Sequence, residues 1–470
     1  MPDTQEQYEQ FRTAIFPHGK SVYDKECFGA ESQDLFYTHI VGKTLQGEYD
    51  YIFVPDYVFY VGKYPSAYIK KVESFSEPDV RKWQQFLWNQ AVVPFLIVKT
   101  RTQLRVYSAT TKPQENDSGE TIEQLLETTV DALDSLKARL ETGDFYAENL
   151  DKLGRENRVD QYLLDNLKAV ANEMAKTQGE LNKDNLQFAH RFLTRILFVC
   201  YLIERGMIKG KHFPEQSVLR QLRSRKESKP FLLKDLLKSL STFTDRKDAI
   251  VSIFKYVKDR FNGSLFEESI SSESKKYGKE FLDLLQKFLE GHEIASGQLT
   301  LGFWAYDFSV IPIEMISSVY DGFLKSEGEI DLNAGEGNSQ SEAGAYYTPP
   351  HLAELAVDMA LEGNKMPIHE LTVVDPACGS GVFLVAMFGR MAQSLRQKMG
   401  YKGKRISINW GKAVLRLLPR IYGIDINPTA CHITCFSLYL AALEQMSPMD
   451  VEDLWAEGEK FPSLLLDKLN

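Results

Sequence analysis

Two acidic residues and two glycines form the pattern with the clearest chemical meaning in this sequence. A short apolar run ends at Asp375, and a turn containing Gly379 and Gly381 leads into a second apolar stretch. A strand, a tight loop and a helix start in this order are the unit with which α/β folds hold nucleotide-like ligands. Because glycine has no Cβ, the backbone of such a loop can come close to the ligand.

A second acid follows another predicted strand, in the segment from Arg420 to Ala430. Asp425 ends this strand, where a carboxylate suits the two ribose hydroxyls of an adenosine. The two acids are 425 − 375 = 50 positions apart, more than the roughly 20 of a minimal strand-helix-strand unit. An insertion such as Tyr401 to Trp410 is therefore expected to bulge out of the domain.

The string from Val373 to Leu384 closely resembles the cofactor loop of the N6-adenine DNA methyltransferases of restriction-modification systems, whose ligand is S-adenosyl-L-methionine. Upstream, GAYYTPP (344–350) resembles the Tyr-Thr-Pro segment of the same enzymes. The resemblance implies a Rossmann-like cofactor domain. Its implied cofactor-binding residues are Asp375, Ala377, Gly379 and Gly381 for the methionine part, Tyr347 and Thr348 as its cover, Asp425 for the ribose, and Ile426 and Asn427 beside the adenine.

The part of these enzymes that handles the target base is absent from the sequence. The family carries a later Asn/Asp-Pro-Pro-Tyr/Phe signature, which accepts hydrogen bonds from the target amino group and stacks on the flipped base. No such segment occurs from Cys431 to Asn470. We therefore expect an enzyme of the large fused (type IIG or type I-like) or phage-defence class, truncated or split after its cofactor motifs. It has no catalytic residues of its own and needs a second polypeptide.

Composition is that of a soluble protein of two or three domains, with 470 residues, 43% hydrophobic and 12% aromatic. The five cysteines form no paired framework, which suits a reducing cytosol. The polar start shows no signal peptide, and charges interrupt the longest apolar run, so no membrane span is expected. The net charge of −10 does not itself favour DNA binding. The resemblance nevertheless implies double-stranded DNA as a partner, in the cytoplasm of a prokaryote.

The region 1–112 is rich in strand signals, beginning with Asp50 to Val61, and includes a helical segment from Asp79 to Asn89. It resembles the nuclease-like domain of fused restriction-modification enzymes, in which an Asp and a Glu hold Mg²⁺ beside a Lys. Asp56 matches the first acid. The next strand, however, offers Ile69, Lys70 and Lys71 in place of Glu-x-Lys, and Glu31 cannot replace the strand acid. Asp56 and Lys71 are therefore expected to be an inactive remnant without a metal, kept for DNA or subunit contact.

Residues 113–325 are expected to form a helical connector that braces the cofactor domain. Helices are predicted from Thr121 to Glu141, closed by Gly143, and from Phe188 to Ile208, which is apolar nearly all round. Another helix start is predicted at Ile311 to Glu314. The charged stretch 223–229 is expected to be a solvated loop. Residues 112–120 and 326–343 are predicted linkers.

The predicted fold is thus a nuclease-like α/β domain (1–112), a helical domain (113–325), a linker (326–343) and the first half of a methyltransferase domain (344–470). Two other functions stay open: a DNA-binding or scaffold subunit without enzymatic activity, and a Mg²⁺-dependent endonuclease. Cys431, His432 and Cys435 are expected to pack in a helix without binding zinc. Cys378 is not expected to act as a nucleophile.

Overall fold

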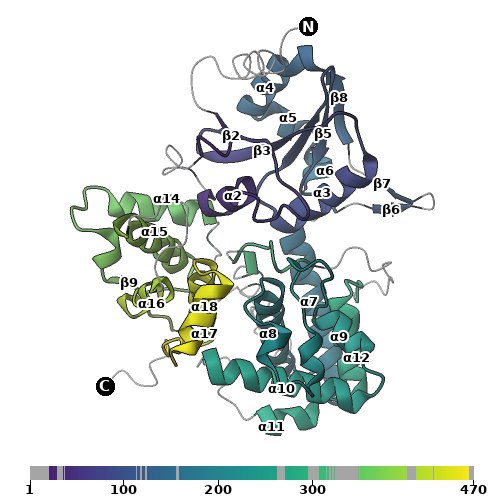
Figure 1. Ribbon diagram of the computed structural model, residues 1–470, viewed down its shortest axis with the longest axis vertical. Helices are drawn as coiled ribbons and strands as arrows, with labels where there is room; N and C mark the ends of the chain where they lie inside the picture. The colour runs from purple at the N-terminus through teal and green to yellow at the C-terminus, as the bar shows by residue number, and fades with distance from the viewer. Residues whose placement is uncertain are drawn as a thin grey trace, which may run out of the picture. The chain divides into compact units, whose positions relative to one another are not determined.

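The computed structural model describes residues 21–28, 35, 37–112, 114–116, 119–121, 124–154, 158–261, 270–294, 306–313, 315–316, 319, 322, 348, 350–399, 409–426 and 428–464. The chain forms two compact units (Figure 1): unit 1 comprises Met1–Tyr162 and Val310–Pro312, and unit 2 comprises Leu163–Ser309 and Ile313–Asn470. Each unit contains a sheet and several helices, so the fold is mixed α/β and rich in helix.

Unit 1 is built on a six-stranded sheet with the strand order β1-β2-β3-β4-β5-β8. The strands are Val22–Tyr23 (β1), Tyr57–Val61 (β2), Tyr64–Lys71 (β3), Phe95–Lys99 (β4), Gln103–Ser108 (β5) and Gln124–Thr129 (β8). β3 and β4 pair in parallel because helix α3 (Glu77–Gln90) connects them, and the other neighbours are antiparallel. The predicted strands and the helix from Asp79 to Asn89 are confirmed, but Asp50 to Val54 lies in turns and irregular chain.

Helices cover both faces of this sheet. One face packs on α2 (Thr38–Leu45) and α3, through a cluster of buried residues that includes Val41, Tyr68 and Leu87. The other face packs on α4 (Leu133–Thr142), α5 (Asp144–Ala147) and α6 (Leu150–Leu153), through a cluster that includes Ile69 and Phe145. Because successive side chains of a strand point to opposite faces, Tyr68 packs in the first cluster and Ile69 in the second.

The helix predicted from Thr121 to Glu141 is wrong over its first half. Gln124–Thr129 is the strand β8, which pairs antiparallel with β5, and a 3-10 turn η1 (Val130–Ala132) precedes α4. Pairing with a sheet edge thus overrides the helical spacing of the leucines. The C-terminal end is as predicted, because Gly143 closes α4 with a φ of +83°. Within the predicted linker 112–120, a short hairpin begins, formed by β6 (Gln114–Asn116) and β7 (Gly119–Thr121).

The helical part of unit 2 is centred on α8 (Lys183–Glu204), which is buried along most of its length. Phe192 of α8 makes edge-on ring contacts with Phe254 and Phe281. The buried helix predicted from Phe188 to Ile208 is confirmed, although it ends at Glu204. The other elements here are α7 (Val159–Lys176, which begins in unit 1), η3 (Gly210–His212), η4 (Val218–Gln221), α9 (Leu233–Ser239), α10 (Phe243–Phe261), α11 (Ile270–Glu273), η6 (Ser274–Lys276) and α12 (Lys279–Leu289).

Among the described helices, α8 is the one that has the length and apolar composition to cross a membrane, and 89% of its apolar window is buried inside the protein. Its apolar surface is therefore used in the core. Further along the chain, Ile313, Met315 and Ile316 are helical and buried, as the predicted helix start requires, whereas Glu314 lies outside the described residues.

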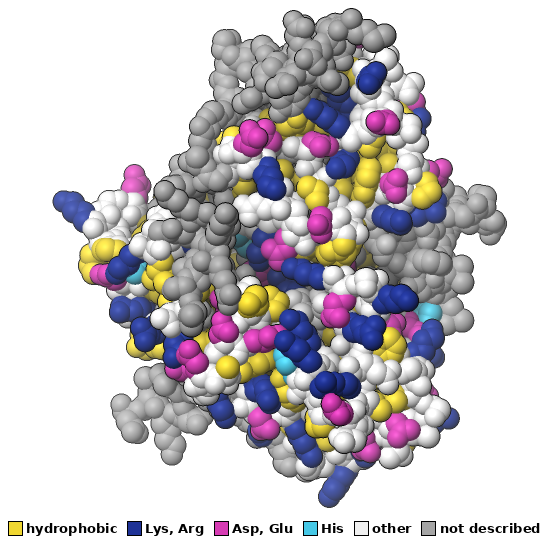
Figure 2. All heavy atoms as spheres, in the orientation of Figure 1, with side chains coloured by type: hydrophobic (Ala, Val, Ile, Leu, Met, Phe, Trp, Pro, Cys, Tyr) yellow, Lys and Arg dark blue, Asp and Glu magenta, His cyan; other side chains and the backbone are white. Residues whose placement is uncertain are grey.

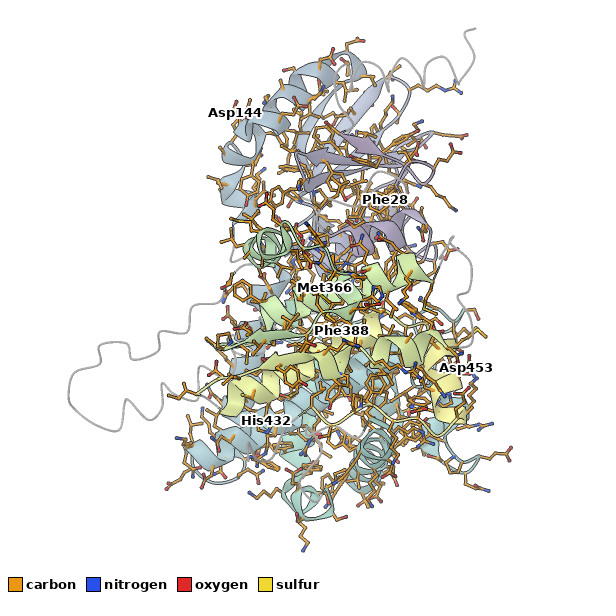
Figure 3. The ribbon with its side chains drawn as sticks, turned by 90° about the vertical axis from the view of Figure 1, so that its left-hand side faces the viewer. Phe28, Asp144, Met366, Phe388, His432 and Asp453 are labelled. Carbon is orange, nitrogen blue, oxygen red and sulfur yellow. The ribbon has the colours of Figure 1, made fainter. Side chains whose placement is uncertain are left out.

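The C-terminal part of unit 2 contains a two-stranded parallel sheet of β9 (Val373–Asp375) and β10 (Ile421–Gly423). Around it lie α14 (Pro350–Leu361), η7 (Ile368–Glu370), α15 (Val382–Lys398), α16 (Trp410–Leu415), η8 (Leu418–Arg420), α17 (Pro428–Glu444) and α18 (Pro448–Ala456). α15 contacts both α14 and α17, and Phe388 of α15, labelled in Figure 3, is fully buried there. The strand-loop-helix-strand order predicted from the sequence is confirmed.

The segment predicted to bulge out between these two strands lies largely outside the described residues, which resume at Asn409. Trp410, at its end, is buried, and its Nε1–H donates to the carbonyl of Gln445 at 2.8 Å. The chain is therefore anchored to the domain core where it returns toward β10.

Candidate cofactor-binding site

Hydrogen bonds within the loop between β9 and α15 help to fix its shape. Asp375 is the last residue of β9, and its Oδ1 accepts a hydrogen bond from the N–H of Ala377 at 3.0 Å. The N–H of Gly381 donates to the carbonyl of Cys378 at 2.8 Å, and α15 begins one residue later. These bonds close a tight turn. As a result, the N–H groups of the first turn of α15, which have no partner within the helix, lie near the carboxyl end of β9.

The two glycines of the loop have different roles. Gly379 has a φ of +52°, and a Cβ placed there would meet no atom within 4 Å, so its surface is open to a ligand. Gly381 has a φ of +83°, and a Cβ there would lie 2.9 Å from Cγ2 of Thr434. Gly379 is therefore suited to close approach of a ligand, whereas Gly381 is required for the packing of the loop on α17.

The second acid lies beside the first, although the two are far apart in the sequence. Oδ2 of Asp425 accepts a hydrogen bond from the N–H of Gly379 at 2.9 Å. The backbone continues the parallel pairing of the strands, because the N–H of Ile424 donates to the carbonyl of Asp375 at 2.9 Å. The structure thus brings Asp375, Gly379 and Asp425 together at the carboxyl ends of both strands.

One oxygen of this site has no partner within the described part of the chain. Oδ2 of Asp375 is buried and accepts no hydrogen bond. A buried carboxylate oxygen without a donor is costly, by about 1–3 kcal/mol or more for a charged group. A ligand that brings a hydrogen-bond donor or a positive charge to this oxygen removes that cost.

Two residues that hold the loop were missed in the sequence. Both lie on α17: the Oγ1 of Thr434 donates to the carbonyl of Gly379 at 2.9 Å, and the Oγ of Ser437 donates to the carbonyl of Ser380 at 3.2 Å. They are spaced one helical turn apart in a largely apolar helix. That spacing places both hydroxyls on one face of the helix, but no local pattern in the sequence shows that this face meets the loop.

Cys378 is a packing residue. It is buried, and burial raises the pKa of its thiol to about 11, so the thiol is protonated at neutral pH. Its side chain fills the space beside Gly423, where an added Cβ would lie 3.0 Å from its Sγ. These properties give no support to a nucleophilic role.

The remaining predicted site residues are placed only in part. Thr348 is half-buried, and Tyr347 and Asn427 lie outside the described residues. The side chain of Ile426 is fully exposed, with a relative accessibility of 101%, and Ile424 is 50% exposed. Their apolar surface is thus available beside Asp425, where the adenine was expected. Cys431 is half-buried and Cys435 is buried in α17.

The helix that holds the loop is itself clamped to the helical region. At the end of α17, the Glu444 carboxylate accepts hydrogen bonds from the Tyr201 hydroxyl at 2.9 Å and from the Arg205 guanidinium at 2.8 Å. Tyr201 lies in the last turn of α8, and Arg205 directly follows the helix. This contact supports the predicted bracing of the cofactor domain by the helical region, with buried and charge-assisted bonds.

A second ionic contact joins α18 to the same region. The Glu452 carboxylate binds the ammonium groups of Lys209 at 3.0 Å and Lys211 at 2.8 Å. Burial acts against the charged carboxylate, but the hydrogen bonds from Lys211 and Lys209 outweigh it and lower the pKa of Glu452 to about 2. The contact is therefore ionised throughout the physiological pH range.

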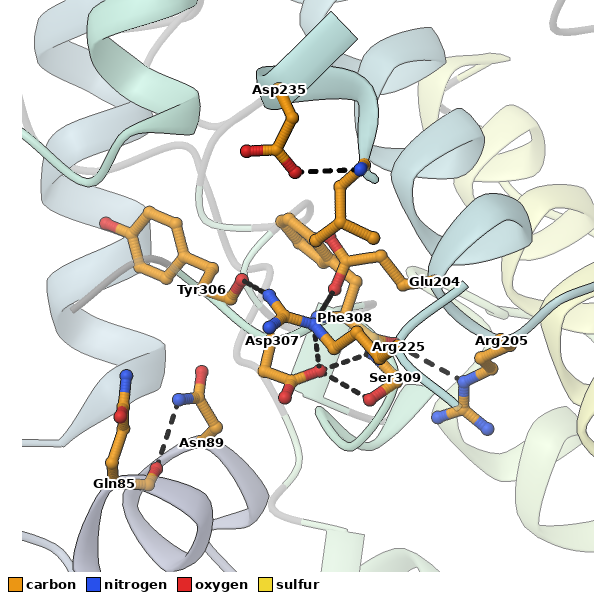
Figure 4. Close-up of polar contacts among 11 residues, drawn as sticks. Gln85, Asn89, Glu204, Arg205, Arg225, Asp235, Tyr306, Asp307, Phe308 and Ser309 are labelled. Carbon is orange, nitrogen blue, oxygen red and sulfur yellow. Dashed lines mark hydrogen bonds and ion pairs between the residues drawn. The ribbon is translucent and has the colours of Figure 1, made fainter. Parts of the chain in front are cut away.

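The loop 223–229 is not simply solvated, as the sequence suggested. Arg225 lies between two carboxylates, with its Nε 2.6 Å from Glu204 Oε2 and 2.9 Å from Asp307 Oδ1 (Figure 4). Glu204 Oε2 also accepts the N–H of Phe308 at 3.1 Å. Glu204 is 5% exposed, and burial, reinforced by Asp307 and opposed by Arg225, raises its pKa to about 7. This cluster lies next to Arg205, and so next to the clamp on α17.

The residues considered for a nuclease site in unit 1 lie at one end of its sheet. Oδ2 of Asp56 accepts the backbone N–H of Lys71 at 2.7 Å and lies 3.8 Å from the ammonium of Lys70. The ammonium of Lys71 donates to the Tyr57 hydroxyl at 2.9 Å. Within the described residues, β3 therefore brings cations, and no second acid, to Asp56.

Comparison with known proteins agrees with the geometry of the C-terminal part. Residues 314–451 match the family model described as N-6 DNA Methylase. The adenine-specific methyltransferase PglX of Streptomyces coelicolor is 31% identical over 98 residues, which are 20% of this chain and 8% of that protein. The match thus spans less than a tenth of that relative's length. The type IIG restriction endonuclease BpuSI is structurally similar over 91% of this chain and 41% of its own, with 11% identity. Its TM-score of 0.28 does not establish a shared fold.

Proposed function

We propose that this chain, whose residues 314–451 match the N-6 DNA Methylase family model, is the cofactor-binding portion of a site-specific DNA N6-adenine methyltransferase of a restriction-modification or phage-defence system. The proposal includes S-adenosyl-L-methionine as cofactor and double-stranded DNA as substrate. It also includes a cytoplasmic location, where the DNA of a prokaryotic host lies.

The main observation in support of the proposal is the buried oxygen Oδ2 of Asp375, which has no hydrogen-bond donor among the described residues. The Asp425 carboxylate, whose Oδ2 accepts from the N–H of Gly379 at 2.9 Å, lies beside it. The two carboxylates make the loop anionic. A carboxylate pair repels the phosphates of ATP or of a dinucleotide, because like charges at short distance disfavour binding. A nucleoside whose other end carries an ammonium and a sulfonium suits the same loop. S-adenosyl-L-methionine is such a ligand.

The residues that would hold the cofactor follow from this chemistry. Asp375 accepts hydrogen bonds from its ammonium group, and the free N–H groups that follow Gly381 suit its carboxylate. Asp425 accepts from the ribose hydroxyls, and the exposed side chain of Ile426 offers an apolar face to the adenine. Ala377 and Gly379 line the loop, and Tyr347, Thr348 and Asn427 complete the proposed set. When bound, the cofactor supplies a methyl group on a cationic sulfur.

The chain's own contribution to the reaction is positioning. Thr434 and Ser437 fix the loop carbonyls, and Glu444 fixes α17 against α8. A loop that is already ordered would thus hold the methyl donor in a fixed orientation. Such orientation of a reactant lowers the barrier to its reaction. The groups that flip and hold the adenine are not among the residues of this sequence, since it lacks the Asn-Pro-Pro-Tyr signature. We propose that a part outside this sequence supplies them, together with target recognition, either as a further stretch of the same protein or as a second polypeptide.

We further propose that unit 1 is a nuclease-like domain that lost its activity. The observation in support is the replacement of the second acid by lysine on β3, next to Asp56. Mg²⁺ requires oxygen ligands and is repelled by ammonium groups.

Equilibrium dialysis tests the cofactor assignment. The protein is expected to retain S-adenosyl-L-methionine at micromolar concentrations, and to retain ATP and NAD far more weakly. Preferential retention of ATP or NAD contradicts the electrostatic argument. Mixed with DNA and cofactor, the chain alone is expected to transfer no methyl group. Transfer by the chain alone contradicts the proposal that the base-handling groups lie outside this sequence.

A further inference from the structure

We propose that the segment 209–223, which lies between α8 and α9 in unit 2, binds phosphate groups of duplex DNA through Arg220 and Arg223. The site belongs to the helical region and is separate from the cofactor loop. That the phosphates belong to DNA rests on the proposed function, whereas the anion site itself rests on the geometry of this segment.

The segment 209–223 is compact, because its two 3-10 turns are in direct backbone contact. The N–H of Gly210, in η3, donates to the carbonyl of Leu222 at 3.0 Å, just beyond η4. A Cβ at Gly210 would collide with the backbone carbonyl of Arg220. The backbone of Arg223 in turn pairs with that of Phe231 in an antiparallel bridge. The part of the chain that carries the two arginines is therefore fixed from both sides.

The guanidinium of Arg220 is held by one of its three nitrogens. Its Nη1 donates to the carbonyl of Lys211 at 3.1 Å and to the carbonyl of Phe213 at 2.9 Å, which uses both hydrogens of that nitrogen. Nε and Nη2 have no acceptor among the described residues, and Arg220 is exposed. Nε and Nη2 form the edge of a guanidinium that binds a phosphate through two oxygens. The two carbonyls thus orient this edge before any ligand arrives.

Arg223 adds a second cation close to the first. Its neighbours Leu222 and Ser224 are buried, so the side chain of Arg223, in an extended stretch, points to solvent. Arg223 makes no ion pair within the described part of the chain. Cα atoms three residues apart are separated by at most about 11 Å, a gap that two arginine side chains span easily. The two guanidinium groups are therefore placed to bind neighbouring phosphates of one strand.

The charge of the segment 209–223 is positive. It contains four basic residues and one acid: Lys209, Lys211, Arg220, Arg223 and Glu215. Glu452 of α18 adds a second acid, but its one carboxylate is shared by Lys209 at 3.0 Å and Lys211 at 2.8 Å. Four cations and two acids leave a charge of 4 − 2 = +2, whereas the whole chain carries −10. An anion is thus attracted to this segment although the protein as a whole is acidic.

The imidazole of His212 adds no charge to the segment. Burial lowers its pKa, Glu452 opposes this change, and the charges of Lys211 and Lys209 lower the pKa further. The positive charge therefore comes from arginine and lysine, which stay protonated near neutral pH. DNA binding through this segment is expected to change little between about pH 7 and about pH 8.

No large basic area competes with this segment on the face drawn in Figure 2. Basic and acidic side chains are mixed there, without one large area of a single charge. A DNA contact of this protein is therefore expected to depend on small groups of cations without acidic partners. Arg220 and Arg223 form such a group among the described residues.

The test measures the binding of a short fluorescent DNA duplex by anisotropy, in EDTA, over a series of salt concentrations. Arg220→Gln and Arg223→Gln each remove one cation of the site. The matched control is Arg416→Gln, which removes an exposed arginine of the same unit, directly after α16. For the loss of one phosphate contact, counterion release predicts an affinity about eightfold lower at about 0.1 M salt and a salt slope smaller by about 1. The control is expected to lose less than about twofold.

The variant Arg220→Lys distinguishes an oriented guanidinium from a charge of any geometry. Lysine keeps the positive charge, but its single ammonium cannot offer a phosphate the planar edge of a guanidinium. The salt slope is therefore expected to stay near that of the natural sequence while the affinity falls. Unreduced affinity in Arg220→Lys would overturn the proposed role of Nε and Nη2.

Four further results would overturn the proposal. They are no duplex binding by the natural sequence, losses in Arg220→Gln and Arg223→Gln no larger than in the control, a salt slope that neither variant changes, and preferential binding of a single-stranded RNA of the same length. Arg220 also holds two carbonyls, so all variants are compared at equal folded fraction, established by thermal unfolding. The side chain of Arg223 holds no other described residue, so Arg223→Gln tests the site without this complication.

Cofactor titration separates this proposal from the proposed function. Titration of S-adenosyl-L-methionine is repeated on each variant and is expected to be unchanged, since none lies in the cofactor loop. Absence of cofactor binding in the natural sequence overturns the proposed function alone. Unchanged cofactor binding with unaltered DNA affinity in both glutamine variants of the site overturns the phosphate site alone.

Discussion

Replacing Glu204 by glutamine is expected to stabilise the protein above pH 7 and to leave its stability nearly unchanged below pH 4.5. The wild-type carboxyl shares Arg225 with Asp307 and is buried, and its pKa is raised from 4.5 to about 7. Glutamine keeps an oxygen that accepts from Arg225 and from the N–H of Phe308, and it removes the buried negative charge. Arg225 retains Asp307 as an ionic partner.

The magnitude follows from linkage. Between pH 4.5 and about 7 the unfolded chain releases the proton of Glu204 while the folded protein still holds it, so the free energy of unfolding falls as the pH rises. The pKa difference is about 2.5, and each pKa unit corresponds to about 1.4 kcal/mol, which gives about 3 kcal/mol. This loss is complete above pH 7 and absent below pH 4.5. Glu204→Gln removes this loss. At high pH the free energy of unfolding of the variant is therefore expected to exceed that of the wild type by up to about 3 kcal/mol.

Urea unfolding of both proteins at about pH 4.5 and about pH 8 measures this difference. The reasoning predicts that the two midpoints nearly coincide at the lower pH and that the variant unfolds at higher urea at the upper pH. A variant that is less stable than the wild type at the upper pH would refute it. That result would mean that the ion pair of Glu204 with Arg225 outweighs the cost of burying the charge.

Three further outcomes are expected. Gly381→Ala places a Cβ 2.9 Å from Thr434 at a φ of +83°; it is expected to lower the free energy of unfolding by about 1–3 kcal/mol and to weaken cofactor binding. The control is Gly389→Ala, in α15 with open space around it. In the same thermal unfolding assay it is expected to be neutral or to stabilise by up to about 1 kcal/mol. Glu452→Gln is expected to destabilise at neutral pH, by an amount that vanishes as the pH falls from 4.5 towards 2, because the pKa of Glu452 is lowered to about 2; a loss that does not depend on pH contradicts the ionic contact with Lys209 and Lys211. Asp425→Ala removes the acceptor for the N–H of Gly379 and is expected to weaken cofactor binding at least about tenfold in calorimetry; unchanged affinity contradicts its place in the site.

The cofactor loop was predictable because its pattern is local and chemically constrained. An acid at the end of a strand and glycine in a turn leave few alternatives for the backbone, and the positive φ of Gly379 and Gly381 shows why those positions are glycine. Asp425 was predictable for the same reason, since the carboxyl ends of parallel strands meet at one edge of a sheet. The ligand roles of these residues stay predictions.

Residues whose roles depend on tertiary contacts were not predictable. Thr434 and Ser437 reach the loop only because α17 packs against α15. Arg225 looked like part of a solvated charged loop, and its partners Glu204 and Asp307 lie 21 and 82 positions away along the chain. No local pattern encodes such a distant pairing.

Strand β8 shows the limit of reading periodicity. Gln124–Thr129 contains leucines that continue the helical spacing of α4, yet it pairs with β5 at the edge of the sheet. The sheet and its helices extend to Tyr162 within unit 1, beyond the boundary expected at Lys112. A short amphipathic segment can satisfy either period, and the free edge of a neighbouring strand decides between them.

Calorimetric titration of S-adenosyl-L-methionine into the wild type, Asp375→Asn and Asp259→Asn tests the central claim most directly. Asp259 is an exposed acid on α10, so its variant controls for the loss of one charge. The account predicts micromolar binding by the wild type and the control, and binding weaker by about tenfold to a hundredfold in Asp375→Asn, since a charge-assisted bond contributes about 1.5–3 kcal/mol. Equal affinity in all three proteins, or no binding in any, would contradict it.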